Sequence, residues 1–533
     1  MPHYKIVITS DRATMTNYSD FNALGFLLCL PKRLIPKFLV DKFIAPRLRV
    51  DKKTGWVNVA PYALRKLEAA LIMRGFSPIE DFVITTPENL PKVVNEETRI
   101  VAIHVLDPMG LAPVSYTLRV LFGGGDTWTK TLFLKLMDKV RKLKEKYNFK
   151  IVVGGPGTWQ IRDIYRKFGI DLLIHGEGEL IFPEVCKLIL EGEDISGELD
   201  GGSVPLELIP PILNPARGGM VQITRGCPRR CRFCNPTMFN FRSIPLDIIR
   251  QEIEVNKRAG YRAMSLVTED GLLYGAKGVR VNKEALRKLL KVVKECSVRA
   301  DFCHVSLAAV KQAPDIVEEW SRENEHFKNF AFPQVGLETG SVRLLKKYMA
   351  GKAAPWRVED WHEIAEESTE IMNRNYWYPC YTLILGLPEE TEDDAKATLE
   401  LIKRLDKYRC WIFPLFFVPM GHSMLEHENF AKPEILKYDI YREILYETLE
   451  HNIKFTKFVL DKFVERIKSK YAQKLVRKFI EYGLSAFENV KNQVRSNLDQ
   501  LLDMAAKVDL NSFVSVTKLV FESILAKFRR KVE

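Results

Sequence analysis

The sequence contains no uninterrupted apolar run of about 18 residues or more, the length that a transmembrane helix needs. It has only nine cysteines among 533 residues, which excludes a disulfide-rich secreted scaffold. The N-terminal stretch MPHYKIVITSD enters a strand-like run and lacks the layout of a signal peptide. These absences lead us to expect a cytoplasmic protein, with any membrane contact made peripherally on the inner face.

The bulk composition is that of a globular protein with more than one domain. A chain of 533 residues is too long for a single hydrophobic core, so two or three domains are expected. The apolar fraction of 46% and the charged fraction of 28% exclude a disordered chain. The formal net charge of +12 permits a nucleic acid, an anionic membrane or an acidic partner, and it selects none of them.

Residues 1–193 alternate short apolar runs with helical patterns. Because strands that alternate with helices form parallel sheets, we expect a doubly wound, Rossmann-like domain, which binds ligands at the carboxyl ends of its strands. The expected strands are Lys5–Thr9, Phe82–Thr85, Ile100–Val105, Ile151–Val153 and Leu172–Ile174, with helices over Ala60–Arg74 and Trp128–Tyr147.

A stretch rich in Pro and Gly, residues 194–219, predicts a linker to a second α/β domain at residues 220–430. Six strands with crossover helices favour a partial (β/α)6 barrel over a closed eightfold one. The expected strands are Met220–Thr224, Ala263–Val267, Asp301–Leu307, Gln334–Leu337, Pro379–Leu385 and Trp411–Val418, with helices Leu246–Ala259, Lys283–Glu295 and Thr391–Leu405.

Residues 431–533 are expected to form an α-helical domain, since Gly483 is the only Gly or Pro after Pro433. Within it, Lys454–Phe479 is basic and amphipathic. Its apolar face comprises Phe455, Phe458, Val459, Phe463, Ile467, Tyr471, Leu475 and Phe479. Such a helix can lie on an anionic membrane or dock on the barrel, and both alternatives stay open. Lys32–Val50 repeats the mixture of apolar and basic residues.

Three cysteines lie close together in the stretch TRGCPRRCRFCNPT. Cys227, Cys231 and Cys234 are one ligand short of a four-cysteine zinc or electron-transfer iron–sulfur site. They can hold three irons of a [4Fe–4S] cubane and leave the fourth iron open for a substrate or cofactor. The alternative is a zinc or redox site whose fourth ligand lies elsewhere in the chain. Four arginines, at positions 225, 229, 230 and 232, are expected to offset the negative charge of the thiolates.

The motif CPRRCRFC, with Phe233 as its aromatic residue, directly follows the first strand of the expected barrel, and it resembles the radical S-adenosylmethionine (SAM) superfamily. The resemblance implies a [4Fe–4S] cluster whose open iron binds the amino and carboxylate groups of SAM. One electron, from a low-potential donor such as ferredoxin or flavodoxin, then cleaves SAM into methionine and a 5′-deoxyadenosyl radical.

Further stretches match the strands on which that family binds SAM. LVTEDG, at the end of the second strand, stands where the family places a polar motif for the SAM amino group, although the usual Gly-Gly-Glu is absent. GLETGS resembles the strand that reaches the ribose or methionine part of SAM, and LILGLPEET resembles the turn beside the adenine. The implied SAM-binding residues are Phe233, Thr268, Glu269, Asp270, Ser306 and Glu338.

The two glycine-rich turns GGPG and GEGE of the first domain let backbone N–H groups approach a ligand closely. Followed by a radical SAM motif, they resemble the cobalamin-binding domain of cobalamin-dependent radical SAM enzymes. The implied cobalamin-binding residues are Asp107, Met109, Gly110, Gly154, Gly155, Gly157, Thr158, Gly176, Glu177 and Gly178. The motif Asp-x-His-x-x-Gly is missing, so we expect no histidine ligand below the cobalt. Core packing of Met109, and a sheet without cofactor, are the alternatives.

Enzymes of this class modify unreactive carbons, mostly by methylation and in some cases by rearrangement or C–C bond formation. The runs TSDRATMTNYSDFNALGF and FFVPMGHSML are similar to archaeal members, among them ring synthases of tetraether lipids and a methyl-coenzyme M reductase glutamine C-methyltransferase. We therefore expect a large hydrophobic lipid substrate or, as the alternative, a protein substrate. A monomer that binds no nucleic acid is expected. A cobalamin or iron–sulfur sensor is the non-enzymatic alternative.

Overall fold

The computed structural model describes residues 3–20, 22–465 and the single residues 470, 473, 477, 481, 488 and 491. Its N-terminal part is a six-stranded sheet in the order β2-β1-β3-β4-β5-β6, and all neighbouring strands are parallel. The strands are β1 (Ile6–Ser10), β2 (Phe82–Ile84), β3 (Ile100–His104), β4 (Lys150–Gly154), β5 (Leu172–His175) and β6 (Gly197–Asp200).

Helices cover both faces of this sheet. Helix α2 (Tyr62–Met73) packs beside α6 (Gly178–Leu190), and α5 (Trp128–Tyr147) contributes a separate row of buried apolar side chains to the same core. Apolar residues of β1, β3 and β4 are almost fully buried, as expected for strands that are covered on both sides. The strand order reverses between β1 and β3, which is the point at which doubly wound sheets bind their ligands. The predicted doubly wound fold is confirmed.

The expected boundary of this domain is wrong. Residues Gly197–Asp200 were assigned to a linker, but they form β6 and pair with β5. Their side chains alternate between half-buried and exposed, because β6 is an edge strand that contributes little to the core. A sequence of this polarity does not show the apolar signature of a strand.

The second part is a barrel of six parallel strands in two sheets, β11-β10-β7 and β12-β13-β14. A parallel bridge between His304 and Gln334 joins the two sheets. No pairing links β7 with β14 among the described residues, so the predicted partial (β/α)6 barrel is confirmed. The strands are β7 (Met220–Gln222), β10 (Ala263–Val267), β11 (Arg299–Phe302), β12 (Gln334–Glu338), β13 (Cys380–Leu385) and β14 (Trp411–Phe416).

The inward faces of the barrel strands are only partly buried. In β13, residues 381, 383 and 385 are buried under the outer helices, whereas residues 380, 382 and 384 are only half-buried. Strands β10 and β14 show partial exposure on their inward faces too. Because side chains alternate between the two faces of a strand, the half-buried set faces the lumen. The main outer helices are α7 (Leu246–Arg258), α8 (Lys283–Glu295), α9 (Leu307–Gln312), α10 (Pro314–Glu323), α12 (Val342–Tyr348), α13 (Trp361–Arg374) and α14 (Glu392–Leu405).

Helix α15 (Asp439–Glu465) covers the free edge of β14. The Asn452 side chain accepts from the Ile412 N–H at 2.8 Å and donates to the Ile412 carbonyl at 2.7 Å. Phe455 and Val459 are buried against Tyr378 in an aromatic cluster. The first part of the amphipathic stretch therefore docks on the barrel, and its continuation (Ile467, Tyr471, Leu475 and Phe479) lies outside the described residues.

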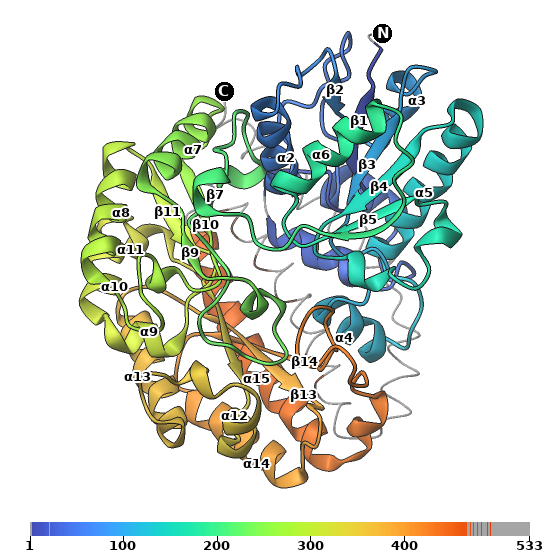
Figure 1. Cartoon of the computed structure of the whole chain (residues 1–533). Helices are drawn as coiled ribbons and strands as arrows, with labels where there is room; N and C mark the ends of the chain where they lie inside the picture. Colours follow the sequence, from blue (N-terminus) through green and yellow to red (C-terminus); the bar gives the residue numbers. More distant parts are fainter. Residues whose placement is uncertain are drawn as a thin grey trace.

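The two α/β parts lie side by side, blue to teal and green to orange in Figure 1. Buried polar contacts join them: Lys66 of α2 pairs with Glu252 of α7 at 2.6 Å, and the Tyr62 hydroxyl donates to the other Glu252 oxygen. The helix α4 (Pro113–Leu121) contacts β14. In the described part of the chain, no helix is long and apolar enough to cross a membrane.

Candidate active site

The three cysteines lie on a loop at the mouth of the barrel. The short antiparallel strands β8 (Thr224–Arg225) and β9 (Arg242–Ser243) pair at the base of this loop. Gly226 opens it with φ +73°, and a Cβ at this position would lie 2.5 Å from the Asn240 carbonyl oxygen. Only glycine fits this close, left-handed position. The pairing thus holds residues 226–241 as a closed loop, which we call the cysteine loop.

The three thiols lie close enough to influence one another's pKa. The pKa of Cys227 is raised to about 12, mainly by burial. The nearby Cys231 thiol adds to this increase, and a hydrogen bond from the Arg229 backbone N–H offsets part of it. Burial, Cys231 and Cys227 likewise raise the pKa of Cys234. Among the described residues, no group of three or more His, Cys, Asp or Glu side chains is placed to hold one metal ion. In a cubane each thiolate binds a different iron, so this donor set fits a cluster better than a single ion.

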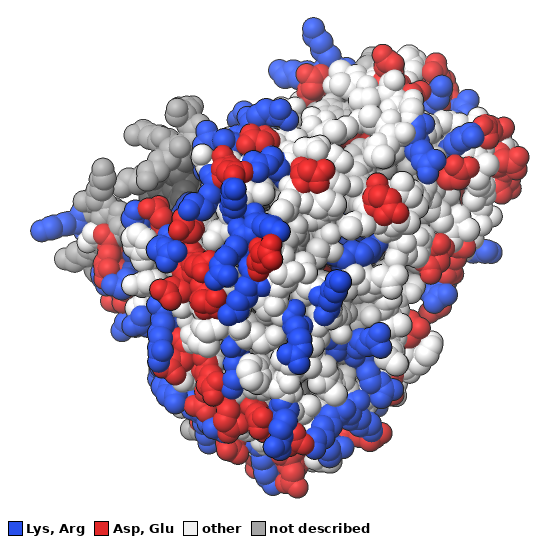
Figure 2. Space-filling view, turned by 60° about the vertical axis from the view of Figure 1, so that its left-hand side comes forward, with Lys and Arg blue, Asp and Glu red and all other residues white. Residues whose placement is uncertain are grey.

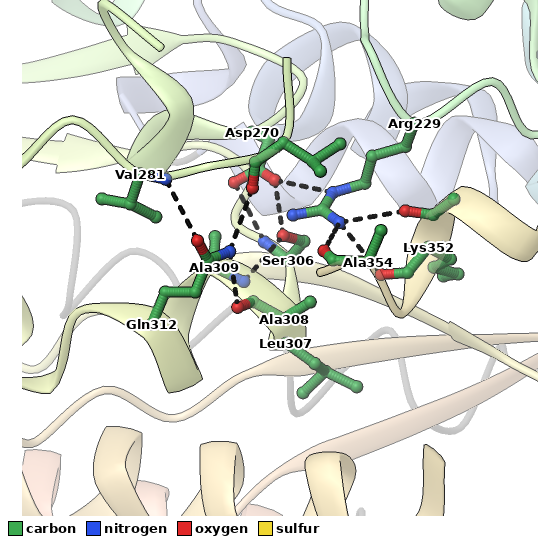
Figure 3. Close-up of polar contacts among 12 residues, drawn as sticks. Arg229, Asp270, Val281, Ser306, Leu307, Ala308, Ala309, Gln312, Lys352 and Ala354 are labelled. Carbon is green, nitrogen blue, oxygen red and sulfur yellow. Dashed lines mark hydrogen bonds and ion pairs between the residues drawn. The ribbon is translucent and has the colours of Figure 1, made fainter. Parts of the chain in front are cut away.

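Arg229 ties the cysteine loop to two barrel elements (Figure 3). Its Nε donates to Asp270 Oδ2 at 3.0 Å, and its Nη1 donates to the carbonyl oxygens of Gly351, Lys352 and Ala354 at 3.0–3.2 Å. A Cβ at Gly351 would lie 2.2 Å from the Arg229 carbonyl oxygen, so glycine permits this approach. The loop is therefore positioned by one buried ion pair and three carbonyl contacts.

Asp270 and Ser306, two of the predicted SAM-binding residues, belong to the same network. The Ser306 hydroxyl and backbone N–H donate to Asp270 at 2.5 and 3.2 Å, and Ser306 also caps α9. Strand β11 runs from Arg299 to Phe302, so the expected strand Asp301–Leu307 begins two residues late and ends five residues too far. Thr268 bonds to Thr224 Oγ1 at 2.6 Å and accepts from the Asp270 N–H. All three side chains are engaged by the protein, which gives them a supporting role.

Glu269 is the carboxylate of the LVTEDG stretch that faces open space. It is exposed and makes no hydrogen bond or ion pair to a described residue. Desolvation by the surrounding protein nevertheless raises its pKa, and nearby His304 lowers it in part. The His304 Nδ1 is buried without a partner in the described part of the chain. Of the four residues Thr268, Glu269, Asp270 and Ser306, Glu269 is thus the one whose side chain is available to a SAM amino group.

Glu338 lies at the carboxyl end of β12 and receives the Lys352 ammonium at 2.8 Å. Burial alone would lower the pKa of Lys352, but Glu338 and the neighbouring Cys231 raise it above its ordinary value. A Cβ on Gly336 would lie 2.0 Å from Glu338 Oε1, so the glycine makes room for the pair. Sequence reasoning did not single out Lys352, although it lies only 14 residues after Glu338. Phe233 is half-buried and packs against the barrel core.

The expected role of the arginines is wrong for Arg225. Its guanidinium pairs with Glu177 and Glu179 of the first domain rather than facing the cysteines. Glu177 also receives Arg242 and the Val204 N–H. This predicted cobalamin-binding residue is therefore the centre of an ion-pair cluster between the domains, which places the turn after β5 beside the base of the cysteine loop.

The glycine turns pack against neighbouring loops. A Cβ on Gly155 would lie 2.6 Å from the Val105 carbonyl oxygen, and one on Gly157 would lie 2.6 Å from that of Leu106. Gly176, with φ +73°, approaches the Asp200 side chain equally closely. The other members of the turns are Gly154, Thr158 and Gly178; Thr158 Oγ1 contacts His175 Nδ1 at 3.0 Å, and Gly178 begins α6. Loop packing therefore explains Gly155, Gly157 and Gly176 independently of any ligand.

Asp107 shapes the loop that follows β3. Its Oδ1 accepts from the N–H groups of Leu111 and Ala112 and from Gln160 Nε2, all at 2.9 Å, and its Oδ2 accepts from Ser115. Met109 is partly buried against the sheet core, and Gly110 has φ +64°. The loop is thus held rigidly at the carboxyl edge of the sheet, beside the switch point. Contact of these residues with cobalamin stays a prediction.

Apolar side chains surround the place where the domains meet. Leu106, Met238 and Met424 are exposed. Their loops touch in succession, because the loop of Leu106 contacts Gly157, Trp159 packs on Gly421, and Asn235 donates to the Gly421 carbonyl at 2.7 Å. We call these three exposed side chains, which lie on loops linked by contacts to the cysteine loop, the apolar rim.

Residues 221–402 match the Radical SAM superfamily. A protein of Archaeoglobus fulgidus described as "Probable threonylcarbamoyladenosine tRNA methylthiotransferase" is 31% identical over 191 residues, 34% of this chain and 42% of that protein. The ribosomal protein uS12 methylthiotransferase RimO of Thermosipho melanesiensis is 27% identical, over 55% of this chain and 61% of RimO. The chain thus spans about half the length of the curated relatives that it matches.

Among solved structures, the fold is similar to TsrM, a radical SAM methyltransferase of Kitasatospora setae. With cobalamin and a [4Fe–4S] cluster bound, that structure has a TM-score of 0.55 and 14% identity, and the match covers 79% of this chain and 77% of TsrM. With tryptophan and the SAM analogue aza-SAM, the TM-score is 0.53 and the identity 15%. At these identities the likeness concerns the fold.

Proposed function

We propose that the chain, whose residues 221–402 match the Radical SAM superfamily, is a cobalamin-dependent radical SAM enzyme acting on an apolar chain. The substrate of our proposal is an archaeal membrane isoprenoid lipid, in which an unactivated carbon is methylated or joined to another carbon. The carrying observation is the juxtaposition of the cysteine loop, the switch-point edge of a doubly wound sheet and an apolar rim.

The residues divide the work. Cys227, Cys231 and Cys234 would hold a [4Fe–4S] cluster, Glu269 would bind the SAM amino group, and Lys352 would place a positive charge beside the thiolates. When bound, the cluster with SAM supplies a 5′-deoxyadenosyl radical, and cobalamin supplies a methyl group. The half-buried apolar side chains of β13 and β14 would exclude water from the reacting carbon.

Two observations favour this proposal over transfer of a methylthio group or action on a nucleic acid. Methylthio transfer requires a sulfur donor, and the six cysteines outside the cysteine loop are spread along the sequence, although Cys380 and Cys410 lie close enough to interact. On the face shown in Figure 2, basic and acidic side chains intermingle over the helices instead of forming one basic stripe. Action on a protein side chain, such as a glutamine, is the second candidate, because the apolar rim would also accommodate a peptide.

The test is anaerobic turnover of the reconstituted protein with SAM, cobalamin, dithionite and isoprenoid ether lipids, followed by mass spectrometry of the lipids and of 5′-deoxyadenosine. We expect 5′-deoxyadenosine together with a lipid that has gained a methyl group or a ring. Cys231→Ser should abolish both products. The control is Cys303→Ser, which changes the cysteine that directly follows β11 and should retain the cleavage of SAM. Product formation without cobalamin would refute the cobalamin assignment. An unchanged lipid and a modified peptide would select the second candidate.

A further inference from the structure

The connection between β1 and α2 is a long insertion with its own small core. Buried apolar residues of η2 (Asn22–Cys29) and of the π-helical turn η3 (Val40–Ile44) pack with Trp128 and Leu132 of α5, and Leu39 of α1 (Lys37–Leu39) is partly buried against them. The Trp128 Nε1 donates to the Ile35 carbonyl at 3.0 Å. Residues 24–50, which we call the insertion, are therefore a folded element and not a loose loop.

The insertion presents large apolar side chains to solvent. Phe26, Leu27 and Phe38 are 51%, 37% and 41% exposed. Scattered single apolar residues are ordinary on a protein surface, but three on neighbouring elements of one insertion are typical of an interaction site. Because the small core fixes η2 and α1 from beneath, these side chains cannot turn inward.

The charge of the insertion selects the kind of partner. Its basic residues are all exposed: Lys32, Arg33, Lys37, Lys42, Arg47 and Arg49. Its one acidic residue, Asp41, is neutralised by Arg12 at 3.0 Å and by Lys37 at 3.1 Å. Exposed aromatic side chains within a basic surface match an anionic lipid membrane, in which rings enter the interface and ammonium groups meet the headgroups.

The insertion is connected to the barrel through helix α4. Its η2 packs against α4. Helix α4 in turn meets the open side of the barrel, since Thr117 Oγ1 accepts from the Phe416 N–H and the Tyr116 hydroxyl donates to the Ala431 carbonyl, both at 2.8 Å. A membrane bound at the insertion would therefore lie on the side of the molecule where α4 joins the two domains (Figure 1).

We propose that the insertion is a docking surface for anionic membranes, through which the protein binds a bilayer peripherally. Docking goes beyond the proposed reaction and does not depend on it.

The test is co-sedimentation of the full chain with vesicles of phosphatidylglycerol or of phosphatidylcholine. We expect binding to the anionic vesicles that weakens at high salt, and at least tenfold weaker binding for the triple variant Phe26→Ser, Leu27→Ser, Phe38→Ser. The control is Met73→Ser, which removes an even more exposed apolar side chain at the end of α2 and should bind like the parent.

Two outcomes would overturn the proposal: equal binding of the triple variant and the parent, or no binding of the parent to anionic vesicles. A result from sedimentation velocity could also overturn it. If the parent forms a dimer and the triple variant does not, the surface binds a second copy of the chain instead of a membrane. SAM cleavage by the triple variant reports that the barrel is intact. It also separates a failure of docking from a failure of the proposed reaction.

Discussion

The ion pair between Arg229 and Asp270 allows a quantitative test of how the cysteine loop is held. The two side chains are 4% and 1% exposed, and Arg229 also supports three backbone carbonyls. Removing one partner leaves a buried charge uncompensated, which costs about 3–5 kcal/mol. We therefore expect Arg229→Gln and Asp270→Asn each to lower the free energy of unfolding by about that amount.

The two changes should not add. Once Arg229 is gone, Asp270→Asn removes a charge that has already lost its partner, so the double variant should be at least about 2 kcal/mol more stable than additivity predicts. Urea unfolding under anaerobic conditions measures all four proteins. The exposed pair of Arg287 and Glu319, 2.7 Å apart on outer helices, is the control, and its disruption should cost less than about 1 kcal/mol. Additivity within about 0.5 kcal/mol would refute the reasoning.

Three further predictions concern the lumen and its surroundings. Glu269→Gln should weaken SAM binding at least about tenfold in calorimetry by loss of a charge-assisted hydrogen bond; equal affinity to that of exposed Glu284→Gln would contradict it. Gly336→Ala should destabilise the chain by about 1–3 kcal/mol, since its Cβ would overlap the pair of Glu338 and Lys352; an unchanged urea midpoint would contradict it. Burial raises the pKa of Glu390 to about 7 from an ordinary 4.5, so its stabilising protonation is lost as the pH rises through 7. Glu390→Gln should therefore be more stable than the parent by about 3 kcal/mol at pH 8 but not at pH 4.5, and equal differences at both pH values would exclude this titration.

The sequence predicted the layers of both α/β parts because their central strands are continuous apolar runs between amphipathic helices. It missed β6, whose edge position leaves it polar. The cysteine trio was evident from its spacing alone. The pairing of Arg225 with Glu177 was not, since it joins residues 48 positions apart in two domains. Local patterns do not encode which of several charged residues meet across an interface.

The same limit applies inside LVTEDG. The pattern placed Thr268, Glu269 and Asp270 at a strand end, but it could not rank them. Only the ion pair between Arg229 and Asp270 separates the two carboxylates. Asp270 is bound within the protein, and Glu269 remains available for a ligand. Glu338 is an ion-paired carboxylate, and it also lies at the end of a barrel strand beside the cysteine loop.

The Asn452 amide bonds to both backbone groups of Ile412 and so acts as a one-residue substitute for a neighbouring strand. The region that matches the superfamily ends at residue 402, before both β14 and this helix. A fragment cut there would leave β13 as a raw edge, with unpaired N–H and C=O groups ready to template aggregation. The smallest part of the chain that leaves no barrel strand with an open edge at this side therefore extends through α15.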